Sequence, residues 1–317
     1  MKGSKNIKKI IFFLIIFLVI LFFSSIFKKY WMEINHYQIN INWIYFIFSL
    51  VLLDTTIIFS AWLWKIILQI ISKKKLKFKT ALKIHISSWL LKYLPGKVGV
   101  ILGKSYLGNK NWKIPQEKII LSSAYEYLFI VLSSFLISFY IIKNINLGNI
   151  NSTFIFILII LITFLLFFIP KLFYLFFNKI IIFLKKEKLK IIIKLSSKEL
   201  VIIFILYLIN RILFGTSFFL LAQSITQIPS SQFIFIASSF VLASTIGFLA
   251  VFAPGGLGVR EGILIILLQN IMPLEMAVIL SILSRIWLLT GDGILALFIL
   301  PQKKLTNILL SLKNEKI

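Results

Sequence analysis

The stretch Ala253-Pro254-Gly255-Gly256-Leu257-Gly258-Val259-Arg260-Glu261-Gly262 lies between two long apolar runs. Proline and glycine are the poorest helix formers, so the stretch predicts a broken helix at or near membrane depth. A helix that restarts near Gly258 would carry Arg260 on its first turn, where helix ends favour anions. Charges at membrane depth are costly and by default mark a functional site. We therefore predict an anion-binding site made of Pro254, Gly255, Gly256, Gly258, Arg260 and Glu261.

The composition of the whole chain predicts an all-α, polytopic integral membrane protein. Of the 317 residues 60% are hydrophobic and 32 are phenylalanine, and the mean hydropathy is +1.00. Several apolar runs reach the roughly 20 residues that a helix needs to span a bilayer. We predict a single transmembrane domain over 1–317 with about eight transmembrane helices, whose apolar runs are 10–27, 43–71, 119–142, 153–169, 199–222, 232–252, 258–271 and 275–300.

The net charge of +25 comes mainly from lysines in the segments that separate the apolar runs. Segments assigned to one side of the membrane carry 28 basic residues, and segments assigned to the other side carry 3. This asymmetry follows the positive-inside rule, which places the basic segments and both termini in the cytoplasm. The charge therefore indicates membrane topology rather than nucleic-acid binding.

The sequence contains none of the common signatures of an enzyme active site. The absence of cysteine excludes disulfides and thiolate chemistry, and His36 and His85 are too few and too far apart in sequence for a metal site. There is no phosphate-binding P-loop and no nucleophile elbow. We therefore predict no metal, no cofactor and no catalytic residue.

A second proline–glycine motif at residues 94–100 resembles the first. Its sequence LPGKVGV shares four of seven positions with residues 253–259, and the two prolines are 159 residues apart. The apolar pieces around Pro95, Gly96 and Lys97 are too short to span, so a re-entrant or half-helix element fits better than a crossing. Paired interrupted helices are typical of transporters built from two repeats, although coincidence is the alternative. The predicted repeats are 10–169 and 199–300, joined by a basic amphipathic connector at 170–198.

The lysine pattern places both motifs on the inner side of the membrane, which predicts parallel rather than inverted repeats. Other charges lie inside the spans. Arg285 and Asp292 are two turns apart on one helix face, so both are expected to face the bundle interior. Arg211 and Glu126 lie on different spans and are expected to pair. Arg260 and its neighbour Glu261 point about 100° apart on a helix and are expected to have different partners. For each of these residues, a pair that only offsets the cost of burial is the alternative.

The two motifs resemble a known family. Residues 93–99, with Lys104 and Tyr106 after them, and residues 253–262 look like the two signatures of the lysylphosphatidylglycerol synthase transmembrane-region family. The resemblance covers residues 8–300. The family includes the membrane half of the multiple-peptide-resistance factor, which moves aminoacylated phosphatidylglycerol between leaflets. After residue 300 too little chain remains for the soluble synthase domain, so aminoacyl transfer is not expected.

The resemblance and the charges within the spans together predict a lipid transporter or flippase-like protein of the bacterial inner membrane. Its expected ligands are anionic phospholipid or glycolipid headgroups, held by Arg260, Arg285, Lys97 or Arg211. One alternative is a membrane-embedded partner of a separately encoded lipid-modifying synthase or glycosyltransferase. Another is a membrane-embedded transferase, for which the sequence offers only scattered carboxylates.

Overall fold

A computed structural model describes residues 40–93, 98–144, 196–250 and 253–299. Every regular element in these residues is a helix. The predicted spans at 10–27 and 153–169, the connector at 170–198 and the first motif residues Pro95, Gly96 and Lys97 lie outside the described residues. The total of about eight transmembrane helices therefore stays a prediction.

Five described helices are long and apolar enough to cross a membrane, and they show a membrane-embedded protein. They are α2 (Trp43–Ser72), α5 (Gln116–Ile137), α9 (Ser197–Gln223), the segment Ser230–Leu249 that ends with α10 (Phe233–Leu249), and α12 (Leu274–Ile299). A short helix, α6 (Phe139–Asn144), follows α5.

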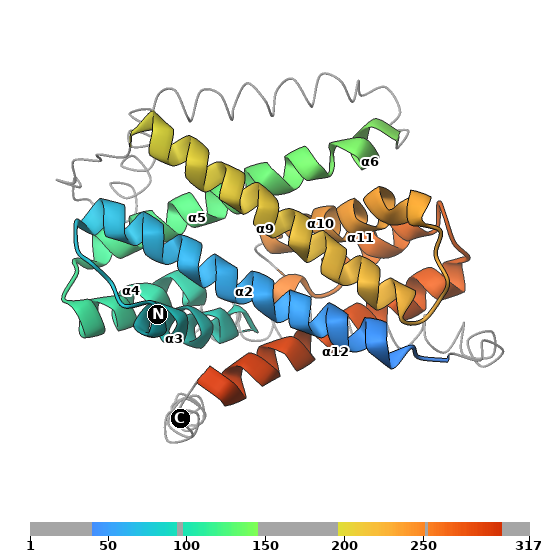
Figure 1. Ribbon diagram of the computed structural model, residues 1–317, viewed down its shortest axis with the longest axis horizontal. Coiled ribbons are helices and arrows are strands. Elements are labelled where there is room, and N and C mark those ends of the chain that lie inside the picture. The colour runs from blue at the N-terminus through green and yellow to red at the C-terminus, as the bar shows by residue number, and fades with distance from the viewer. Residues whose placement is uncertain (1–39, 94–97, 145–195, 251–252, 300–317) are drawn as a thin grey trace, which may run out of the picture.

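Helices α2 and α9 form an antiparallel pair along the length of the molecule (Figure 1). The Asn42 amide at the start of α2 donates to the Ser224 carbonyl at the end of α9, 2.7 Å away. Near the middle of both helices, Asn210 donates to the Thr56 carbonyl at 2.8 Å. The Asn42 side chain also caps α2.

The first interrupted element is a hairpin of two short helices, α3 (Phe78–Trp89) and α4 (Val98–Trp112), with the 3₁₀ turn η1 (Leu90–Tyr93) between them. Small residues let these helices approach, because a Cβ added to Gly103 of α4 would lie 3.1 Å from the Ser88 hydroxyl of α3. At 12 and 15 residues they rise roughly 18 and 22 Å, which is less than the ~30 Å hydrocarbon core. Neither helix is long enough to cross by itself, which agrees with the re-entrant element that the sequence predicts here.

The second hairpin contains the broken helix predicted around residues 253–262. After α10 the chain turns through η3 (Pro254–Gly256) and returns as α11 (Val259–Leu268). Gly256 and Gly258 have φ of 72° and 81°, a left-handed conformation that glycine adopts without strain. Gly247 of α10 lies against Arg260 of α11, and Leu242 and Leu267, further from the turn, pack in one cluster, so the two helices run antiparallel. Residues 232–252 and 258–271 therefore pack as one hairpin. Helix α11, at 10 residues, is too short to cross by itself, whereas Ser230–Leu249 is long enough to be a candidate span.

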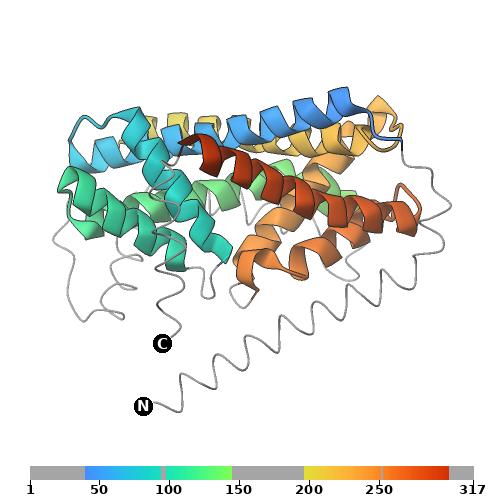
Figure 2. The ribbon, with the colours of Figure 1, turned by 90° about the horizontal axis from the view of Figure 1, so that it is seen from below.

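The two hairpins enter the bundle from opposite ends. Helix α3 follows the C-terminal end of α2, whereas α10 follows the end of α9 that lies beside the N-terminal end of α2. Figures 1 and 2 show α3 and α4 at one end of the bundle and α10 and α11 at the other. Their turns η1 and η3 are in contact. The parallel arrangement predicted from the lysines, which requires entry from the same end, is not the one in the structure.

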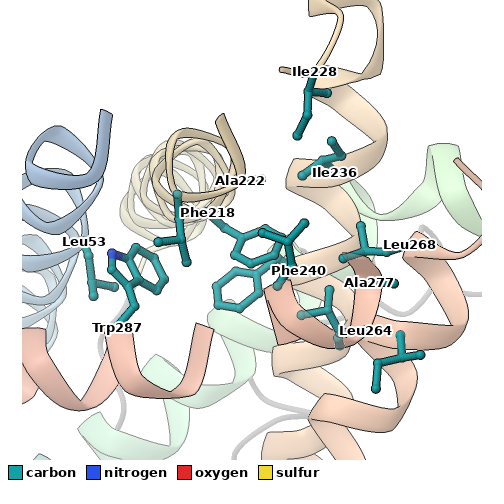
Figure 3. Close-up of a cluster of buried hydrophobic side chains, with 14 of the residues drawn as sticks. Leu53, Phe218, Ala222, Ile228, Ile236, Phe240, Leu264, Leu268, Ala277 and Trp287 are labelled. Carbon is teal, nitrogen blue, oxygen red and sulfur yellow. The ribbon is translucent and has the colours of Figure 1, made fainter. Parts of the chain in front are cut away.

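Aromatic packing fixes the second hairpin to the long helices (Figure 3). The rings of Phe218 on α9 and Phe240 on α10 stack at 4.2 Å, and Trp287 on α12 meets Phe240 edge-on at 5.9 Å. The Trp287 indole donates to the Ser49 hydroxyl on α2 at 3.0 Å, so its polar atom is satisfied inside the apolar cluster. Leu264 adds α11 to the same cluster.

Basic residues gather at one end of the described bundle, where α2 and α4 end and α5 and α9 begin. They are Lys73, Lys74, Lys75, Lys77, Lys110, Lys113, Lys118 and Lys198. At the other end the described residues carry one lysine, Lys143. The distribution agrees with the positive-inside pattern read from the sequence.

Candidate functional site

A cavity of about 160 Å³ lies where the two hairpin turns meet the long helices. Its wall includes Ile57, Glu126, Arg211 and Arg285, each near the middle of its own helix. Because these helices are long enough to span the bilayer, the cavity lies near the bilayer midplane. Its volume is several times the ~30 Å³ that one water molecule occupies in the liquid.

Residues at matching positions of the two halves line this cavity together. His85 and Ser244, Trp89 and Phe248, and Glu126 and Arg285 are all lining pairs separated by 159 positions. This is the separation of the two motif prolines. At these three positions, each hairpin and the long helix that follows it contribute residues with the same spacing to the cavity wall.

The start of α11 is occupied by its own acidic residue. Glu261 accepts a hydrogen bond from the Gly258 amide at 2.8 Å and pairs with the Arg260 guanidinium at 2.5 Å. The prediction that Arg260 and Glu261 have separate partners is wrong, because their side chains are long enough to converge despite diverging Cα–Cβ bonds. Glu261 therefore fills the helix end that the sequence assigned to an anionic ligand.

Helix α12 is tied to both hairpins from the cavity wall. Arg285 donates to the Gly255 carbonyl at 3.0 Å and lies 3.6 Å from Glu261, both in the second hairpin. Asp292 pairs with Lys92 of η1 at 2.6 Å and accepts from the Trp89 indole at 3.0 Å. Arg285 and Asp292 both face the interior, as their spacing predicted.

Glu126 pairs with a residue of the first hairpin rather than with Arg211. The Lys104 ammonium lies 2.5 Å from its carboxylate, and both side chains are about 1% exposed. The ring of Trp64 lies 4.7 Å from the same ammonium. Arg211, the partner that the sequence suggested for Glu126, makes no direct ion pair with it, although the two charges interact at longer range. Lys104 lies between Gly103 and Ser105, and these small neighbours, which permit deep helix packing, are the signal that could have identified it.

His85 lies beside this pair, with Nδ1 3.8 Å from the Glu126 carboxylate. Burial lowers the pKa of His85 well below its usual value, and the Lys104 ammonium lowers it further. The imidazole is therefore neutral near neutral pH, and Lys104 alone supplies the charge opposite Glu126.

Arg211 lines the cavity from α9. It donates to the Asn210 side chain at 2.6 Å, and its guanidinium lies 4.8 Å from the Phe214 ring. Asn210 is fully buried and is fixed in turn by the Thr56 carbonyl and by the Ser60 hydroxyl, 3.3 Å away.

The described site carries more cations than carboxylates. Five cationic and four acidic side chains lie at or beside the cavity, namely Lys92, Lys104, Arg211, Arg260 and Arg285 against Asp54, Glu126, Glu261 and Asp292. Such a site suits an anion at a depth where water cannot screen charge.

Most of the predicted site residues meet here. Seven line the cavity: Glu126, Arg211, Gly255, Gly256, Arg260, Arg285 and Asp292. Pro254, Gly258 and Glu261 lie beside them in η3 and the cap of α11. Lys92 was not singled out from the sequence, because its position at the end of a half-helix resembles that of an ordinary interfacial lysine.

A family model described as lysylphosphatidylglycerol synthase TM region matches residues 10–294. The match confirms the resemblance read from the two motifs. No match to the chain was found among curated proteins or among solved structures.

Proposed function

This chain belongs to the lysylphosphatidylglycerol synthase transmembrane-region family, and on that premise we propose that it moves a lipid with an anionic headgroup between the leaflets of the bilayer. The observation that carries the proposal is the cavity at mid-depth with its excess of cations. The lipid would cross without chemical change.

The physical obstacle to lipid movement is the headgroup. An unpaired charge in hydrocarbon costs many kcal/mol, whereas acyl chains cross freely. A cavity at the midplane whose wall carries Arg211, Arg260 and Arg285 lowers this barrier. Apolar lining residues such as Phe248 and Leu288 suit the adjoining acyl chains.

The arrangement of the two hairpins and the long helices supports transport. Opposite entry of the hairpins, the antiparallel α2 and α9, and the lining pairs 159 residues apart are the features of an inverted repeat. Inverted repeats place the substrate site near the midplane, and one half can open as the other closes. In this account the contacts of α12 with each hairpin close the cavity on either side.

We also propose an orientation. The basic end of the bundle would face the cytoplasm of a bacterium, so α3 and α4 would enter from the cytoplasmic side and α10 and α11 from the outside. Both termini would then be cytoplasmic.

A leaflet-exchange assay tests the function. Purified protein would be reconstituted into vesicles with fluorescent phosphatidylglycerol, and a membrane-impermeant quencher would report how fast outer-leaflet lipid is replaced. We expect faster exchange than in protein-free vesicles and slower exchange with Arg260→Ala. If no anionic lipid exchanges faster than in protein-free vesicles, transport is excluded.

A second candidate is a membrane-embedded partner for a separately encoded lipid-modifying synthase or glycosyltransferase. The ion pairs inside the site favour it, because such pairs can serve packing alone. In that case a soluble enzyme would co-purify with the chain, and Arg260→Ala would leave that enzyme's activity unchanged.

A further inference from the structure

We propose that Arg211 is the residue that holds the charged group of the transported lipid, and that this group is a phosphodiester. The inference rests on the proposed function and deepens it. It departs from the sequence, in which Arg260 of the second motif is the first choice.

Four of the five cations at the site already contact a carboxylate. Lys92, Lys104, Arg260 and Arg285 lie 2.6, 2.5, 2.5 and 3.6 Å from one, respectively. Among the described residues, Arg211 is the cation of this group that has no carboxylate within 4.0 Å. At this depth a guanidinium that no described carboxylate contacts directly is costly, so the arrangement indicates an anion that arrives from outside the chain.

The orientation of the Arg211 guanidinium is fixed, and several of its N–H donors remain available for a ligand. A guanidinium has five N–H donors, and Arg211 uses one of them, in its hydrogen bond to Asn210. Its Nε is buried and makes no hydrogen bond within the described part of the chain. Asn210 is held by Thr56 and Ser60, so the direction of the guanidinium is set before any ligand binds.

A second donor without an acceptor lies on the neighbouring helix. The Ser244 hydroxyl on α10 is buried, lines the same cavity and makes no hydrogen bond among the described residues. Buried polar atoms are normally satisfied, so unsatisfied donors on two cavity-lining helices indicate a missing acceptor. Arg211 and Ser244 together define the proposed subsite.

The chemistry of the missing acceptor follows from the donors. A phosphodiester offers two free oxygens with one shared charge, and a guanidinium binds such an oxyanion through two parallel N–H bonds. Among the described residues of the site, the five cations exceed the four carboxylates by one, which a single negative charge balances. Arg260 and Arg285 are already engaged by Glu261 and would instead shape the cavity.

The test measures lipid binding to the full chain in detergent by native mass spectrometry. The probes are phosphatidylglycerol, diacylglycerol with the same chains, a prenyl pyrophosphate and inorganic phosphate. Charged hydrogen bonds predict a loss on the order of 10- to 100-fold in phosphatidylglycerol affinity for Arg211→Gln and a smaller loss for Arg211→Lys. Diacylglycerol binding should not change. Lys65→Gln, a charge change on α2 away from the cavity, is the matched control and should bind like the wild type.

Each other outcome is informative. If Arg211→Gln binds phosphatidylglycerol as the wild type does, the Arg211 assignment is overturned while the proposed function stands. Tighter binding of the pyrophosphate, or equal binding of inorganic phosphate, overturns the phosphodiester lipid. If the wild type does not prefer phosphatidylglycerol to diacylglycerol, the proposed function itself fails. Should Arg211→Gln not fold, Arg211→Lys, which keeps the charge, is expected to lower affinity at unchanged melting temperature.

Discussion

The Lys92 ammonium lies 2.6 Å from the Asp292 carboxylate, and this contact joins the turn of the first hairpin to α12. Seven positions earlier on α12, Arg285 donates to the Gly255 carbonyl of the second hairpin at 3.0 Å. One helix therefore holds both hairpin turns at the cavity. Asp292 contacts the first hairpin and Arg285 contacts the second. Changes at these two positions of α12 should therefore affect the two hairpins separately.

Replacing Asp292 with asparagine should loosen the first hairpin. The change leaves the Lys92 ammonium without its carboxylate in a site where water is scarce, which we expect to cost roughly 3 kcal/mol. The measurement is thermal unfolding of the purified protein in detergent. Lys92→Met with Asp292→Asn should recover part of the loss, and a double variant less stable than Asp292→Asn would contradict the pairing.

The buried pair of Lys104 and Glu126 should behave differently when one or both partners are changed. Glu126→Gln leaves a buried ammonium uncompensated and should lower stability by roughly 3 to 5 kcal/mol. The double change Lys104→Met, Glu126→Leu removes both charges, and apolar pairs of similar size are often as stable. A double-mutant cycle of unfolding free energies, with Lys104→Met and Glu126→Leu as its single variants, measures the coupling. A loss in the double variant equal to the sum of the two single losses would show that the pair is not coupled.

Gly247 tests the packing of the second hairpin. A Cβ at this position would lie 2.8 Å from the Cβ of Arg260, so Gly247→Ala should push α10 and α11 apart and cost about 1 to 3 kcal/mol. Gly262→Ala is the matched control, because nothing lies within 4 Å of its added Cβ and alanine favours a helix by about 1 kcal/mol. Similar melting temperatures for the two variants would show that α10 and α11 are not in close contact at Gly247.

Stability should depend on His85 at acidic pH. Its pKa is lowered in the folded protein, so the unfolded chain binds the proton more readily. The stabilisation is therefore fully present above pH 6.5 and is lost as the pH falls toward the lowered folded pKa. Melting temperatures between pH 8 and pH 5 should fall for the wild type and fall less for His85→Gln. Parallel curves would assign the acid sensitivity to other groups.

Several parts of the site were predictable from the sequence. Proline and glycine in residues 253–262 marked the broken helix, because their backbone preferences do not depend on tertiary context. Arg285 and Asp292 were placed in the interior by the cost of exposing charge to lipid. Backbone preference and the cost of a charge in lipid are properties of each residue by itself.

The partners of those residues were not predictable in the same way. Glu126 pairs with Lys104 because α4 folds back against α5 as half of a hairpin. The sequence positions of the two residues do not show that the chain folds back there. The direction of the second hairpin was also hidden, since the segment Ser230–Leu249 is long and apolar enough to pass for a crossing. Charge counting in loops cannot separate a crossing from a re-entrant hairpin that begins on the other side.

The central claim is that the cavity at the bilayer midplane opens to both faces of the membrane. The chain has no cysteine, so a single Ser244→Cys variant reports on the cavity alone, with Ser239→Cys, which is buried away from it, as the control. Sealed vesicles of known orientation would receive a membrane-impermeant maleimide on one side or the other. We predict labelling of Ser244→Cys from both sides and none of Ser239→Cys. Labelling from one side only, with or without phosphatidylglycerol, would contradict transport through this cavity.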